Sequence, residues 1–229
     1  KKCTLTGAGR ALPLDWDVLR AAIGDTEGKL IRPTEALGAL AVIKRLAQNV
    51  KPVRDLLGDA IVRFPDADSI AGRQGERGAG RGKEVESYLA ILHMDGDRMG
   101  QHLAGLTKAE EHQAFSAMLS TFAEETVPAI VGKYPPAQLV YAGGDDVLAV
   151  APLGCVLVLA EEIRRAFEAA TAALHQGKPL RMSAGIAAAP SNLPFDAALN
   201  DARQAEKTAK TTYDRDAVVI RETHRSGQI

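Results

Sequence analysis

Residues 141–147 read Tyr-Ala-Gly-Gly-Asp-Asp-Val and lie between two apolar runs, 138–141 and 147–151. Apolar runs joined by a short glycine-containing segment are typical of a β-hairpin, because glycine adopts positive φ without steric cost. This hairpin carries two adjacent carboxylates, Asp145 and Asp146, at its tip. Like charges this close repel each other, so the pair favours a nearby cation such as a divalent metal ion. An acidic, solvated turn is the alternative interpretation.

A second acidic segment follows a continuous apolar run. Residues 88–94 read Tyr-Leu-Ala-Ile-Leu-His-Met, which predicts a buried strand, and Asp95, Gly96 and Asp97 come directly after it. A buried strand that ends in carboxylates is suited to a metal site. Asp97 has an alternative role as the cap of the turn after the strand. His93 lies inside the apolar run and is predicted to be a packed core residue.

One helix is predicted over residues 109–133, between this strand and the hairpin. The helix returns the chain, so the first two strands run in the same direction and the third strand inserts beside the first. This arrangement places Asp95 next to Asp145 and Asp146. Carboxylates that converge on one point require cations, and Mg²⁺ suits an all-oxygen site that leaves room for phosphates.

The chain after the hairpin continues as helix, strand, helix and strand. Helices are predicted over 157–175 and 195–210, and strands over 180–187 and 217–220. One face of the last helix is thin enough to lie close to the sheet, because alanines recur there: Ala198, Ala202, Ala205 and Ala209. The pattern predicts an α+β, ferredoxin-like βαββαβ domain, an antiparallel sheet with helices on one face, plus an added helix and edge strand.

Four parts are predicted along the 229 residues. They are a small leading unit (1–50), a linker with a Gly/Arg-rich loop (51–87), the main domain (84–222) and a tail (223–229). In the leading unit a helix is predicted over residues 34–48, with Thr34 as its N-cap, and Trp16 is predicted to anchor the core.

The formal net charge is −1, so a nucleic-acid partner would need a local basic surface. Residues 71–83 are rich in glycine and arginine and offer such a surface, with a solvated loop as the alternative. No apolar run is long enough for a membrane span. Cys3 and Cys155 cannot form a disulfide framework, which favours a reducing compartment.

Four motifs in order resemble a known family. They are Asp95-Gly-Asp-Arg-Met-Gly after the first strand, the 141–149 hairpin, Ser183-Ala-Gly-Ile-Ala, and Ala205-Glu-Lys-Thr-Ala-Lys at a helix end. Together they resemble the Palm domain of the large subunit of type III CRISPR effector complexes, closest to the Cmr branch. More remotely they resemble GGDEF nucleotidyl cyclases. The resemblance covers residues 84–220.

The resemblance implies a Mg²⁺- or Mn²⁺-dependent nucleotidyltransferase that converts ATP to cyclic oligoadenylate when its complex binds target RNA. The implied catalytic residues are Asp95, Asp145 and Asp146. The implied metal ligands are these three carboxylates, Asp97 and the Gly96 carbonyl. The implied nucleotide-binding residues are Gly143, Gly144, Ser183, Lys207 and Lys210. Without the resemblance, the two lysines are equally well explained as cations at a helix C-terminus.

The implied partners are other subunits of a type III CRISPR complex, with crRNA and target RNA bound through that complex, in the cytoplasm of a prokaryote and away from membranes. The leading unit is similar to the family's zinc-binding stretches, but Thr6, Gly38 and Ala41 stand where the family has cysteines. Cys3 alone cannot supply four ligands, so zinc is not expected. Two alternatives stay open: a catalytically silent scaffold subunit and a diguanylate-cyclase-like enzyme.

Overall fold

The computed structural model describes residues 13, 15–22, 31, 37, 42, 67–72, 88–174 and 179–223. The chain divides into two compact units, residues 1–63 and 64–229. Several predictions fall outside the described residues: Cys3 with its neighbours, most of the 34–48 helix, most of the 71–83 loop, and residues 224–229. The four-part division of the chain stays a prediction.

The first unit contains helix α1 (Trp16–Ala22). Ile31 and Leu37 are fully buried, and Trp16 packs against them. The indole therefore contributes to a small apolar cluster, which agrees with its predicted role as a core anchor.

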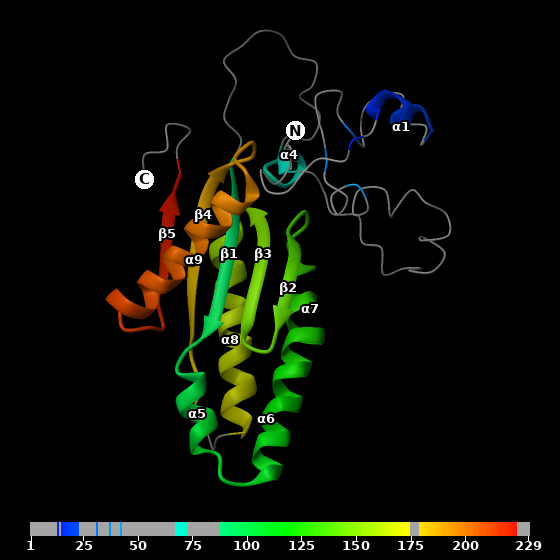
Figure 1. Cartoon of the computed structure of the whole chain (residues 1–229). Coiled ribbons are helices and arrows are strands. Elements are labelled where there is room, and N and C mark those ends of the chain that lie inside the picture. The colour runs from blue at the N-terminus through cyan, green and yellow to red at the C-terminus, as the bar shows by residue number, and fades with distance from the viewer. Residues whose placement is uncertain are drawn as a thin grey trace. The chain divides into compact units, whose positions relative to one another are not determined.

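The second unit is built on a five-stranded sheet in the order β2-β3-β1-β4-β5 (Figure 1). The strands are β1 (Tyr88–Gly96), β2 (Gln138–Gly143), β3 (Asp146–Pro152), β4 (Met182–Pro190) and β5 (Val218–Glu222). β1 lies in the centre and pairs antiparallel with β3 and β4, as predicted for a third strand inserted beside the first. The added edge strand β5 pairs parallel with β4.

Helices cover both faces of the sheet. The predicted βαββαβ core has its helices on one face: α6 (Ala109–Thr121), the π-helical turn η2 (Phe122–Thr126), α7 (Val127–Val131) and α8 (Val156–Leu174). The added helix α9 (Phe195–Thr212) lies on the opposite face, where α4 (Ala67–Ile70) also packs. In Figure 1, α9 crosses in front of the sheet and α8 lies behind it. The α+β prediction is confirmed.

The predicted helix over 109–133 contains a widened turn. Within η2 and its cap, the Val127 N–H donates to the carbonyl of Phe122, five residues earlier. Pro128 follows directly. Proline has no N–H, and its ring clashes with the carbonyl four residues before it in a regular α-helix. A π-type turn accommodates this defect, and the helix then continues as α7.

The alanine face of α9 lies directly on β4. All four alanines of this face are buried: Ala198, Ala202, Ala205 and Ala209. A Cβ added to Gly185 would lie 2.1 Å from the Ala202 carbonyl oxygen, so the helix backbone contacts the strand backbone. Because the helix lies this close to the sheet, Lys210 of α9 reaches Asp95 at the end of β1.

Candidate functional site at the end of strand β1

The alternation of side chains along β1 determines which face carries the acidic residue. Ala90, Leu92 and Met94 belong to the core beneath α8, whereas Ile91 belongs to the core beneath α9. Because successive side chains point to opposite faces, Asp95 shares the α9 face. Its contact with Lys210 of α9 agrees with this placement.

The hairpin brings Asp145 to the same place. Gly143 pairs with Asp146, and Gly144 in the turn has a φ of +66°, which glycine adopts easily. A Cβ on Gly96 would lie 2.6 Å from Oδ2 of Asp145. The bare backbone at Gly96 therefore lets the hairpin carboxylate approach the end of β1. Asp145 therefore lies beside Gly96, the neighbour of Asp95, and the charge of Asp95 acts on it, as the predicted strand order requires.

Both hairpin carboxylates have raised pKa values. Burial is the main cause for Asp145, and the negative charge of Asp95 adds to it. Burial also raises the pKa of Asp146; His93 opposes that change and Asp95 reinforces it. The imidazole Nε2 of His93 lies 3.4 Å from Oδ1 of Asp146. The negative charges at this edge of the sheet thus disfavour one another.

Lys210 supplies a positive charge in direct contact with the Asp95 carboxylate. Its ammonium contacts the Asp95 carboxylate, lies 3.0 Å from Oε1 of Glu206 and donates to the Gly96 carbonyl oxygen at 3.3 Å. Burial lowers the pKa of Lys210, but the hydrogen bonds to Asp95 and Glu206 outweigh it, so the pKa is raised overall. Lys210 is therefore held as a cation among oxygen atoms.

Two further cations lie on the same side of α9. Arg203, Lys207 and Lys210 recur at spacings of four and three residues, which places them along one side of a helix. Arg203 and Lys207 are exposed. The charge of Arg203 reaches the hairpin, where it partly opposes the burial that raises the pKa of Asp146. This side of α9 is suited to binding a polyanion.

The side chains of Asp97 and Ser183 are hydrogen-bonded to each other. The Ser183 hydroxyl donates to Oδ1 of Asp97 at 2.8 Å, and the Asp216 N–H donates to Oδ2 at 2.9 Å. Ser183 is fully buried and Asp97 nearly so. Both side chains are thus engaged in a structural link between β1, β4 and the segment before β5. Both oxygens of the Asp97 carboxylate accept these hydrogen bonds, and the Ser183 side chain has no exposed surface in this structure.

The glycines of the hairpin differ in accessibility. A Cβ on Gly143 would lie 1.9 Å from the Tyr141 hydroxyl, so the tyrosine ring covers that backbone. At Gly144, the nearest atom to such a Cβ is a methyl carbon of Leu119, 4.0 Å away. Of the two predicted nucleotide contacts, Gly144 has the open backbone.

The donor atoms at the end of β1 fit a hard cation. Asp95, Asp145 and the Gly96 carbonyl present only oxygen, which Mg²⁺ and Mn²⁺ prefer. The Lys210 ammonium, which contacts Asp95 and the Gly96 carbonyl, stands in for a cation there. Within the part of the chain that the structure describes, no group of three or more His, Cys, Asp or Glu side chains is gathered tightly enough to hold a metal ion alone. Phosphate oxygens and water would have to complete the coordination.

Two residues near this site were not predicted from the sequence. His93 faces Asp146, although it was predicted to be a core residue; its place two positions before Asp95 puts both on one face of β1 and could have indicated this. Arg203 lies one helical turn before Lys207, and this four-residue spacing could have indicated that both lie on the same side of α9.

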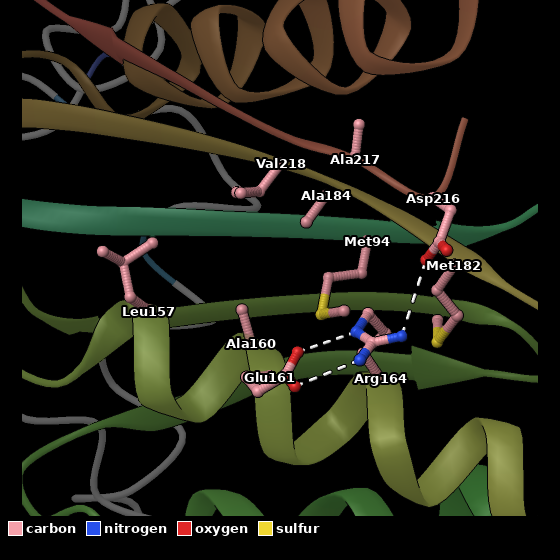
Figure 2. A pocket seen from close by; sticks show the side chains of 10 residues that line it. All are labelled: Met94, Leu157, Ala160, Glu161, Arg164, Met182, Ala184, Asp216, Ala217 and Val218. Carbon is pink, nitrogen blue, oxygen red and sulfur yellow. Dashed lines mark hydrogen bonds and ion pairs between the residues drawn. The ribbon is translucent and has the colours of Figure 1, made fainter. Parts of the chain in front are cut away.

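A separate pocket lies on the opposite face of the sheet, beneath α8. It has a volume of about 280 Å³, and its floor includes Met94 and Met182 (Figure 2). Arg164 at its polar end is bound by Glu161 and Asp216, as the dashed lines in Figure 2 show. This guanidinium is already paired, whereas Arg203 and Lys207 on α9 are exposed, so the α9 face remains the better candidate for binding a polyanion.

The family model of the Cas10/Cmr2 second palm domain matches residues 88–219, more than half of the chain. The chain belongs to the Cas10/Cmr2 family. The matched palm domain runs from β1 to the start of β5 and includes Asp95, the hairpin and the cationic side of α9. The resemblance to the Palm domain of type III CRISPR large subunits is confirmed.

Individual relatives agree with the family assignment. The CRISPR system Cmr subunit Cmr2 of Pyrococcus furiosus is 31% identical over 169 residues, which cover 61% of this chain and 19% of the relative. A Csm1-Csm4 cassette in complex with one ATP has a TM-score of 0.53 at 25% identity, and the match covers 62% of this chain and 22% of that one. A Csm1-Csm4 subcomplex of the type III-A interference complex gives the same values.

The Cas10/Cmr2 palm chain thus spans about a fifth of the length of these relatives. Among its described helices, none is both long enough and apolar enough to cross a bilayer.

Proposed function

We propose that this palm domain binds ATP with Mg²⁺ or Mn²⁺ and joins adenylate units by nucleotidyl transfer, as the catalytic part of a type III CRISPR large subunit. The observation that carries the proposal is the approach of Asp95 and Asp145 across Gly96, beside three cations on one side of α9. A Csm1-Csm4 cassette of the same fold is described in complex with ATP and another with AMPPNP, which supports a nucleotide as ligand.

In the proposed reaction, the 3′-hydroxyl of one ATP attacks the α-phosphorus of a second. The new bond joins that 3′-oxygen to phosphorus, the α–β phosphoanhydride bond breaks, pyrophosphate leaves, and the hydroxyl proton passes to solvent. Phosphoryl transfer depends mainly on positioning and on neutralisation of charge. Repetition and ring closure would give the cyclic oligoadenylate that the family resemblance implies.

Each residue of the site has a proposed part in this reaction. Asp95, Asp145 and the Gly96 carbonyl would hold the divalent ions, with Asp146 next to them. When bound there, the ions would neutralise charge on the attacking and leaving oxygens. Lys207 and Lys210 would bind the triphosphate as mobile point charges. The open backbone at Gly144 would lie against the substrate.

Asp97, Ser183 and Gly143 take supporting roles in this proposal. Asp97 and Ser183 anchor the end of β1 to β4 through their hydrogen bond, and so position Asp95. Gly143 provides room for the Tyr141 ring. The proposed partners are the other subunits of a type III complex, with crRNA and target RNA bound through them. A scaffold role that needs no nucleotide leaves the repelling carboxylates without a purpose.

The test is calorimetric titration of the chain with AMPPNP in the presence of Mn²⁺. We expect binding that depends on the metal and is lost in the double variant Asp145→Asn/Asp146→Asn. Glu124→Gln, which removes an exposed charge on η2, serves as the matched control and should bind like wild type. Preference for a GTP analogue would favour the diguanylate-cyclase alternative, and absence of nucleotide binding would favour the scaffold.

A further inference from the structure

Lys210 occupies the position that a divalent cation needs at the end of β1. Its ammonium contacts the Asp95 carboxylate and donates to the Gly96 carbonyl oxygen at 3.3 Å. These are two of the groups proposed above as metal ligands. An ammonium is a compact cation that takes oxygen neighbours, so it satisfies the same donors as a hard metal ion.

A second carboxylate keeps Lys210 in this position. Oε1 of Glu206, one helical turn earlier, lies 3.0 Å from the ammonium, and only 12% of the Glu206 side chain is exposed. The turn that carries Glu206 is itself fixed, because a Cβ on Gly185 would lie 2.2 Å from the Glu206 backbone nitrogen. The ammonium is therefore bound on one side by Glu206 of α9 and on the other by the end of β1.

A divalent ion and the Lys210 ammonium would compete for one position, because the ammonium already contacts both the Asp95 carboxylate and the Gly96 carbonyl oxygen that the ion would bind. A bound metal ion would displace Lys210. The displaced ammonium needs another anion besides Glu206, and the triphosphate of a nucleotide provides one next to the exposed Lys207.

We propose that Lys210 and a divalent cation exclude each other at Asp95 and Gly96, and that a nucleoside triphosphate relieves this exclusion by drawing Lys210 away. Metal and nucleotide then bind cooperatively. Because coupling between two ligands is reciprocal, nucleotide raises the affinity for metal by the same factor as metal raises the affinity for nucleotide. This inference rests on the proposed function, since it assumes the same metal ligands.

The test is a Mn²⁺ titration of the chain without nucleotide, in which free Mn²⁺ is measured by electron paramagnetic resonance. Lys210→Gln is expected to bind Mn²⁺ about tenfold more tightly than wild type, a difference near 1.4 kcal/mol. Lys210→Arg keeps a cation in place and is expected to resemble wild type. Lys207→Gln removes the same charge from the same helix without a contact to Asp95, and should change the affinity by less than about threefold. Lys210→Met, which preserves the packing of the aliphatic stem, repeats the test if the glutamine variant folds poorly.

The outcomes separate this inference from the proposed function. Equal Mn²⁺ affinity in wild type and Lys210→Gln, with metal-dependent AMPPNP binding intact, would overturn the exclusion alone. Equal strengthening by Lys210→Gln and Lys207→Gln would also overturn it, since the effect would then be one of net charge. No Mn²⁺ binding by any variant, with or without AMPPNP, would overturn both proposals. Loss of AMPPNP–Mn²⁺ coupling in Lys210→Gln would support the exclusion.

Discussion

Gly185 of β4 lies so close to Glu206 of α9 that a Cβ on the glycine would fall 2.2 Å from the Glu206 backbone nitrogen. The atoms it would meet belong to the helix backbone, which cannot move aside as a flexible side chain can. The proposed site therefore depends on a residue with no side chain at all. The position of Lys210 follows from this contact, because it lies one turn beyond Glu206 on the same helix.

Gly185→Ala is expected to separate α9 from β4 and to destabilise the domain by about 3 kcal/mol or more, as overpacking does when backbone must shift. Thermal unfolding measures the change, and AMPPNP binding should weaken with it. Gly100→Ala is the control: nothing lies within 4 Å of a Cβ there, and alanine favours the helix α5 (Met99–Gly105) that contains it. Equal stability of the two variants would contradict the close backbone contact.

Asp145→Asn is expected to stabilise the chain while it abolishes metal-dependent nucleotide binding. Burial and Asp95 raise the pKa of Asp145, so its charged form is disfavoured in the folded state at neutral pH. The neutral amide removes this penalty, and because Asp145 is only half-buried, solvent screening limits the expected gain to less than about 1 kcal/mol, or an increase in Tm of at most about 2–4 °C. The gain should shrink as the pH falls through the raised pKa, because wild-type Asp145 is then protonated.

Thermal melts of Asp145→Asn in the absence of metal, at several pH values, check this expectation. The control is Asp214→Asn, because Asp214 is highly exposed and asparagine tolerates its left-handed backbone. That variant should stay within about 0.5 kcal/mol of wild type. A destabilised Asp145→Asn variant would mean that this carboxylate is held by favourable contacts.

Ser183→Ala is expected to destabilise the chain by about 1–3 kcal/mol, because it leaves Oδ1 of the buried Asp97 without its hydroxyl donor. Chemical denaturation measures this difference. Ser191→Ala removes a comparable hydroxyl, 2.9 Å from Oδ1 of Asp68 in a half-buried place, and should have a smaller effect. If Ser183→Ala instead kept full stability and lost nucleotide affinity, the serine would contact the nucleotide as its sequence motif implied.

The stability of the domain should depend on Glu161 at acidic pH. Hydrogen bonds from Arg164 and Arg165 lower the pKa of Glu161 from 4.5 to about 2. A depressed folded-state pKa gives stability that is complete above the unfolded value of 4.5 and is lost as the pH falls toward 2. Glu161 is partly exposed, so solvent screening limits the effect to less than about 1 kcal/mol.

Glu161→Gln should therefore lower the unfolding free energy at pH 6 and leave it nearly unchanged at pH 2, relative to wild type. Urea titrations at the two pH values give this comparison. The exposed residue Glu110 offers a control on another helix, as Glu110→Gln. An equal loss at both pH values would show that the glutamine acts through packing, with no role for the ion pairs.

The sequence predicted most of the fold because its signals are local. Tight turns, proline positions and apolar runs gave the strands, and the βαββαβ order placed Asp95 beside the hairpin. The alanine spacing of α9 predicted its close approach to the sheet. The parallel pairing of β5 and the position of α9 on the second face could not be read in the same way, because they depend on how distant segments pack.

The sequence predicted that Asp95 lies beside the hairpin. It did not predict the hydrogen bonds of Asp97 and Ser183, because their partners are far apart in the sequence. Asp97 was grouped with Asp95 because the two are neighbours in sequence. In the structure both oxygens of the Asp97 carboxylate accept hydrogen bonds, from the Ser183 hydroxyl and the Asp216 amide. These partners lie 86 and 119 residues away. The contact of His93 with Asp146 was missed because a continuous apolar run does not show which side chains point to which face of the sheet.

The central position of β1 has a consequence for how the molecule opens. Both edges of this strand are paired, so its amide hydrogens should exchange with solvent only when the whole domain unfolds. The last turn of α9, which carries Lys210, ends at Thr212 and can fray at a much smaller free energy. We therefore expect the Asp95 amide to exchange more slowly than the amides of the helix end that carries its cation.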